Sequence, residues 1–141
     1  MNHQQLIEIG LNFEGTSLKY PFAPDLPVLF VNKRMFALLG NLHGVEMVNL
    51  KTSPDEAWIH RETYSGAVLP GYHMNKKHWN TVLLNNTVPD DVIIEMLWES
   101  YQRVIAKLPK VERESLRLRS GTHGIHLINV DGIAKKFVKA W

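Results

Sequence analysis

The spacing of apolar residues divides the first fifty positions into one helix and three strands. Leu6, Ile9 and Phe13 recur at helical spacing after Asn2, which can cap a helix, and Gly15 can end it. Runs of β-forming residues follow and are separated by turn residues; they cover positions 28–31, 35–39 and 45–50. These runs predict three consecutive strands.

Helix and strand signals alternate in the middle of the chain. Ser53 with Glu56 three residues later, and Pro between them, predicts a helix from Pro54 to about Thr63. Two more strands are expected around Val68 and over 78–84. Pro89 and the two acidic residues after it open a long helix that should end near Leu108.

The predicted order is therefore α-β-β-β-α-β-β-α, with no connection long enough to join parallel strands. We expect an α+β fold, a two-layer α/β sandwich in which helices cover one face of an antiparallel sheet.

Residues 111–141 are patterned less regularly. Leu116 and Leu118 alternate with Arg117 and Arg119, which predicts a strand paired through a turn at 121–124 with a second strand over 125–130. Asp131-Gly132 fits either a hairpin turn or a helix start. The helical spacing of Ile133, Phe137 and Trp141 favours a short terminal helix.

Composition and charge narrow the classes of protein. The 141 residues fit one domain, which we divide into a core at 1–110 and a C-terminal extension at 111–141 packed on it. With no Cys, thiolate catalysis and Cys-ligated metals are excluded. The sequence shows neither a secretory signal nor a membrane span, so a cytoplasmic location is expected. Residues 1–110 hold 10 basic and 11 acidic side chains, whereas residues 111–141 hold 6 and 3.

Three ordered motifs carry a family resemblance. The segment 70–82, PGYHMNKKHWNTV, resembles the signature of the MmcQ/YjbR family. Tyr20-Pro21-Phe22 with 33–37, and the segment 100–109, are similar to its amino-terminal hairpin and its closing helix. The resemblance covers residues 1–110 and implies a secretion-chaperone-like or frataxin-like fold. It also implies DNA binding, although residues 111–141 depart from the family pattern.

One predicted turn concentrates groups that suit nucleic acid. Asn75, Lys76, Lys77 and His78 lie between the last two predicted strands, with Tyr72 and Trp79 beside them. Lysines can contact phosphates and an aromatic ring can stack on an exposed base. The same residues also fit a simple turn with solvated lysines and Trp79 in the core. A second basic group lies in the extension: Arg113, Arg117, Arg119, Lys135, Lys136 and Lys139.

Metal and catalytic sites find little support. His123 and His126 near Asp131, or His73 and His78, could bind a metal, but neither pair has a third ligand fixed by spacing. No nucleophile elbow or phosphate-binding glycine loop is present. Paired carboxylates such as Asp90 and Asp91 are explained by the helix dipole. We expect no enzyme activity, cofactor or metal.

The apolar surface exceeds what a two-layer domain buries. Apolar residues on the last long helix span about 140°, and an ordinary surface helix needs only about 100°. Strict alternation would place Met35, Ala37 and Leu39 on one face of their strand and Phe36 and Leu38 on the other. We therefore expect residues 111–141, or a second copy of the chain, to cover this surplus. Phe137 and Trp141 would be buried anchors.

Taken together, these features favour a small non-enzymatic protein that binds duplex DNA through Tyr72, Asn75, Lys76, Lys77, His78, Arg117 and Arg119. The alternative is a protein-interaction or chaperone-like module, including a homodimer, with no nucleic-acid role. Neither interpretation involves a membrane or a small-molecule cofactor.

Overall fold

Six strands form one antiparallel sheet. The computed structural model describes residues 1–120 in full, and the backbone of residues 125–130 and 133–138. The sheet order is β1-β2-β3-β4-β6-β5, and every neighbouring pair is antiparallel. The strands are β1 (Thr16–Lys19), β2 (Val28–Val31), β3 (Arg34–Leu42), β4 (Val45–Lys51), β5 (Val68–Pro70) and β6 (Trp79–Leu83). The expected α+β fold is confirmed, although the short strand β1 was not predicted.

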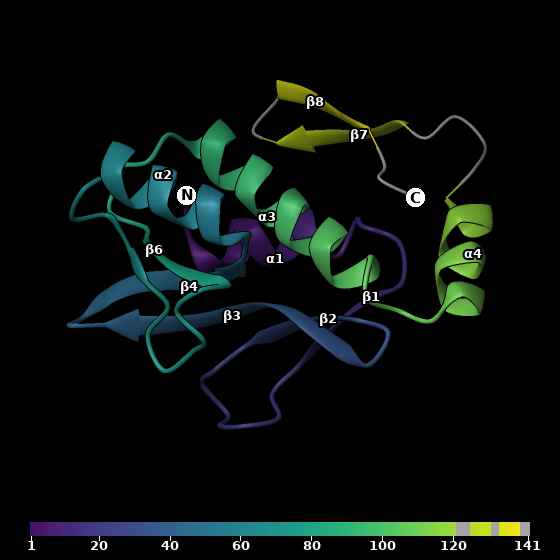
Figure 1. Cartoon of the computed structure of the whole chain (residues 1–141), viewed down its shortest axis with the longest axis horizontal. Helices are drawn as coiled ribbons and strands as arrows, with labels where there is room; N and C mark the ends of the chain where they lie inside the picture. The colour runs from purple at the N-terminus through teal and green to yellow at the C-terminus, as the bar shows by residue number, and fades with distance from the viewer. Residues whose placement is uncertain (121–124, 131–132, 139–141) are drawn as a thin grey trace.

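Three helices lie on one side of this sheet (Figure 1): α1 (His3–Gly10), α2 (Pro54–Thr63) and α3 (Asp90–Ile105). α1 begins with a full capping box, in which Asn2 and Gln5 each accept a hydrogen bond from the other's backbone N–H. At α2, the Ser53 hydroxyl accepts a hydrogen bond from the Glu56 N–H, at 3.2 Å. These helix starts are where the sequence predicted them.

The core lies between the helices and the sheet. Phe13, Phe36, Trp98 and Tyr101 form an aromatic cluster with ring centroids 4.9 to 6.2 Å apart. The wide apolar arc of α3 is buried in this layer, including Ile94 and Trp98 at its margin. Tyr101 is 1% exposed, and its hydroxyl donates a 2.7 Å hydrogen bond to the Glu14 carbonyl. Burial raises the pKa of Tyr101 well above its usual value, and the nearby Glu14 carboxylate adds to the shift.

The C-terminal part differs from its prediction at two elements. Residues 110–119 form a helix, α4 (Lys110–Arg119), where a strand was expected around Leu116. The strand β7 (Ile125–Val130) is present, but it pairs with β8 (Ile133–Val138), so the expected terminal helix is wrong over these residues. The predicted turn at 121–124 and the Asp131-Gly132 pair lie outside the described residues.

The distribution of charge along α4 favours a helix. Its acidic Glu112 lies in the first turn and its basic Arg117 and Arg119 in the last, which complements the helix dipole. Glu114 and Arg117 also pair at i and i+3, at 2.9 Å. The short alternation of leucine and arginine was consistent with a strand, but it places only Leu116 in the core and leaves Leu118 exposed.

α4 packs against the start of the sheet through Leu116, which is fully buried. Glu112 accepts a 3.0 Å hydrogen bond from the Asn32 side chain in the β2–β3 turn. Gly15 lies beneath Leu116 with a φ of +76°, and a Cβ there would collide with the leucine. The first part of the extension therefore contacts the core, whereas Trp141 and the side chain of Phe137 lie outside the described residues.

Candidate functional site

A β-bulge decides which side chains face away from the helices. The β2–β3 pairing shifts register so that Leu29 pairs with Ala37 and Phe30 with Met35, leaving Phe36 without a partner. Phe36 and Ala37 are consequently both buried in the core with Leu39. The strict alternation expected from the sequence is wrong here, because the bulge turns Phe36 inward and leaves Met35 on the opposite face.

An apolar groove lies on this helix-free face. Its volume is about 430 Å³, and it lies where the 20–27 and 71–78 loops cover β3 and β4. Figure 1 shows both loops on the side of the sheet away from α3. Three of the five methionines and no acidic residue line the groove, whose lining comprises Phe22, Leu26, Met35, Leu38, Gly40, Asn41, Met47, Asn49, Tyr72, His73 and Met74. The groove is therefore a concave apolar surface whose lining also includes aromatic rings and side-chain amides.

A closed set of hydrogen bonds fixes Tyr72 over the groove. The Tyr72 N–H donates to the Thr81 hydroxyl at 2.8 Å, and that hydroxyl donates to the Asn49 side-chain oxygen. The Asn49 amide then donates back to the Tyr72 carbonyl at 3.4 Å. Asn49 and Thr81 are fully buried, whereas Tyr72 is 44% exposed. The ring is thus held by its backbone and remains accessible, with the His73 ring 4.0 Å away.

The 71–78 loop brings together five of the residues predicted to bind DNA: Tyr72, Asn75, Lys76, Lys77 and His78, all exposed. Asn75 shapes the turn, because its side-chain oxygen accepts a 2.9 Å hydrogen bond from the Lys77 N–H. The Lys76 ammonium donates to the Gly71 carbonyl at 3.2 Å. Trp79, by contrast, is 8% exposed and anchors the loop to the sheet. Lys77 is therefore the most available cation of this loop.

Arg117 and Arg119 do not join this group. Both lie on α4, which packs near β1 and the β2–β3 turn, whereas the 71–78 loop joins β5 and β6 at the other edge of the sheet (Figure 1). Arg117 pairs with Glu114 at 2.9 Å, and Arg119 with Glu14 at 3.8 Å. Sequence reasoning grouped them with the loop on charge alone, which carries no information about distance.

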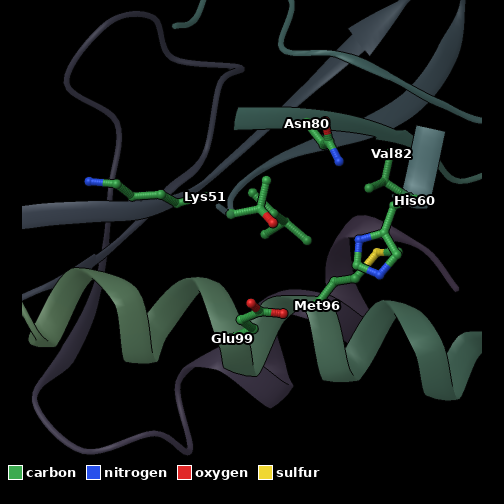
Figure 2. A pocket seen from close by; sticks show the side chains of 8 residues that line it. Lys51, His60, Asn80, Val82, Met96 and Glu99 are labelled. Carbon is green, nitrogen blue, oxygen red and sulfur yellow. The ribbon is translucent and has the colours of Figure 1, made fainter. Parts of the chain in front are cut away.

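A second, much smaller cleft lies between α2, α3 and the ends of β4 and β6 (Figure 2). Its volume of about 10 Å³ holds roughly one water molecule. The side chains of His60 and Glu99 point toward it, whereas Lys51 extends away. The Thr52 hydroxyl, also in the lining, is buried and has no hydrogen-bond partner within the described chain. The cleft suits a bridging water and leaves no room for an organic substrate.

Two further features concern metal binding and membrane insertion. Within residues 1–120, no three His, Asp or Glu side chains are grouped as metal ligands. The His123, His126 and Asp131 side chains lie outside the described part. No helix of the described ranges is both long and apolar enough to cross a bilayer.

Fold and groove together define a class: a small α+β protein whose described helices α1, α2 and α3 cover one face of the sheet and whose other face carries an apolar groove. The chain belongs to the YjbR family, whose model matches residues 11–103. It is 30% identical to the uncharacterized protein YbdF of Escherichia coli O157:H7, over 84% of this chain and 95% of that one. It is 38% identical to the uncharacterized protein YjbR of Escherichia coli K12, over 58% of this chain and 69% of that one.

Solved structures agree with this assignment. A Deinococcus radiodurans protein with a DUF419 domain superposes with a TM-score of 0.76 at 31% identity, covering 87% of this chain and 93% of that one. A Pseudomonas syringae protein superposes with a TM-score of 0.64 at 31% identity, covering 73% and 98%. The names of these relatives state no activity.

Proposed function

We propose that this chain is a non-enzymatic nucleic-acid-binding protein that uses the groove and the 71–78 loop. The observation that carries the proposal is the exposed Tyr72 ring, fixed at the rim of a groove whose lining contains no acidic side chain. Bases stack on such rings with a gain of about 1–3 kcal/mol each. Lys77 and Lys76 on the same loop can contact phosphates.

A single strand fits this site better than the duplex expected from the sequence. A concave groove of about 430 Å³ can receive unstacked bases, whereas bases in a duplex are stacked inside it and reachable only by a protruding element. The phosphate contacts then lie on the loop, and the ion-paired Arg117 and Arg119 at the far edge take no part.

The test is fluorescence anisotropy with labelled single-stranded and duplex oligonucleotides of the same sequence. Tyr72→Ala should weaken single-strand binding about 5- to 150-fold, which corresponds to the loss of one stacked base. Trp58→Ala removes an even more exposed aromatic side chain from α2 and should leave the affinity unchanged. The Lys76→Ala, Lys77→Ala double variant should reduce the salt slope by about 1.4, the effect of two phosphate contacts. Equal affinities for Tyr72→Ala and Trp58→Ala would refute the proposal.

A second candidate function is the binding of an apolar protein segment, from another protein or a second copy of the chain. Met35, Met47 and Met74 favour it, because flexible methionine side chains adapt to varied apolar partners. Such binding should be nearly independent of salt. Apolar peptides selected from a displayed library should bind the native chain and lose affinity for Met74→Lys; selection of acidic or no peptides counts against this candidate.

A further inference from the structure

Four basic residues lie around the place where β3 begins, β4 ends and α3 approaches its last turn. Ser100 marks the place: its hydroxyl accepts a 2.8 Å hydrogen bond from the Lys51 N–H and donates one of 2.6 Å to the Phe36 carbonyl. Arg103 follows Ser100 by three residues and lies on the same side of α3, and Lys107 lies in the turn just after the end of the helix. Arg34 opens β3, two residues before Phe36. Arg34, Lys51, Arg103 and Lys107 are called the α3-end cluster below.

Acidic side chains do not balance the cluster. Arg103 pairs with Glu99 at 3.1 Å. Within residues 1–120, Arg34, Lys51 and Lys107 form no ion pair, and Arg34 and Lys107 are exposed. Burial lowers the pKa of Lys51, and the charges of Lys107, Arg34 and Arg103 lower it further. A bound anion would offset these unbalanced positive charges.

One member of the cluster extends from the face of the sheet that carries the groove. Lys51 follows Asn49 by two residues on β4 and so extends from the same face of the strand, whereas Arg34 directly precedes Met35 and extends from the opposite face. Asn49 and Met35 both line the groove, and no residue of the cluster does. Arg103 and Lys107 belong to α3 and the turn after it, on the other side of the sheet (Figure 1), so Lys51 alone connects the cluster with the groove face. Sequence reasoning missed the cluster because its members are far apart along the chain.

We propose that the α3-end cluster binds a phosphate group. A free phosphate or a phosphate monoester carries a charge of about −1.5 to −2, and a strand phosphodiester carries one negative charge. Both offer acceptor oxygens that suit the fork of an arginine and the point charges of lysines. The phosphate can belong to a nucleic-acid strand or to a free phosphorylated molecule. The connection to a strand rests on the proposed function, and it requires the strand to pass from the groove around the end of β4 to the cluster.

The full chain is titrated with inorganic phosphate, followed by amide NMR shifts, with sodium chloride at matched ionic strength as the control for screening. Saturable shifts are expected at Arg34, Lys51, Arg103 and Lys107, with a dissociation constant on the order of 1 mM. Lys51→Met should weaken phosphate binding at least about fivefold, the effect of one screened charge contact. Lys19→Met, on β1, removes the same charge elsewhere and should leave it unchanged.

Lys107→Met, at an exposed position, provides the same test if Lys51→Met does not fold. Amide shifts that are identical in sodium chloride would overturn the site. So would phosphate binding that is equal in Lys51→Met, Lys107→Met and Lys19→Met.

A single-stranded oligonucleotide separates the two sources of phosphate. Weaker oligonucleotide binding by Lys51→Met supports a strand phosphate. Phosphate binding without any oligonucleotide binding supports a small phosphorylated ligand and refutes the proposed function alone.

Discussion

Ser100 completes the sheet at the point where the β-bulge interrupts it. The bulge at Phe36 takes its carbonyl out of direct pairing with the Lys51 N–H, and the ladder between β3 and β4 begins only at Ala37 and Leu50. The Ser100 hydroxyl fills this gap, with one hydrogen bond to each strand, and is fully buried. Ser100→Ala removes both hydrogen bonds while changing the side-chain volume little.

The free energy of unfolding that Ser100→Ala loses can be worked out from the two backbone groups that lose their hydrogen-bond partner. A buried N–H without an acceptor costs about 1–3 kcal/mol, and the Phe36 carbonyl loses a further donor. Alanine gains at most about 0.5 kcal/mol over serine in helix propensity. We expect a net loss of about 2–3 kcal/mol. At roughly 4 °C per kcal/mol for a domain of this size, the melting temperature should fall by about 8–12 °C.

The matched control is Ser115→Ala, because Ser115 lies on α4, is exposed and gains the same helix propensity. Both variants are compared with the native chain by urea and thermal denaturation, and the Lys51 amide is followed by hydrogen exchange. Exchange of that amide should quicken in Ser100→Ala only. A difference between the two variants below about 0.5 kcal/mol would show that the strands do not depend on the hydroxyl, and would refute the reasoning.

Three further predictions concern pH, the α4 contact and the extension. Because Tyr101 stays neutral in the folded chain while the unfolded tyrosine ionises near pH 10, stability should fall above pH 10 by about 1.4 kcal/mol per pH unit. Tyr101→Phe should lose this part of the slope in denaturation curves, and an unchanged slope would contradict the assignment. Gly15→Ala should lower stability by at least about 1 kcal/mol more than Gly44→Ala, which has a similar positive φ but no neighbour within 4 Å; equal losses would exclude the Leu116 contact as the cause. Deletion of residues 111–141 removes the buried Leu116 and should lower the melting temperature or cause aggregation, whereas an equally stable, monomeric product would make the extension dispensable.

Local chemistry in the sequence determined most of the elements of residues 1–110. The cap residues Asn2 and Ser53 were sufficient to place the starts of two helices, because the hydrogen bonds that cap a helix are made within four residues. The strands β2, β3 and β4 followed from runs of β-forming residues bounded by turns. The motif around residues 70–82 placed the chain in its family, and it also located the exposed loop of the candidate site.

Only the tertiary structure decided on which face of the sheet a side chain lies and which distant residues become its neighbours. One extra residue in β3 reversed the side on which Phe36 lies, and no local pattern predicts such a bulge. Arg117 and Arg119 were grouped with the loop by charge, although the fold places them at the far edge of the sheet. Short patterns such as the leucines of α4 fit a helix and a strand alike, so packing chose between them. The groove and the α3-end cluster join residues that are distant in the chain, and their proximity is set by sheet order and helix docking rather than by local sequence.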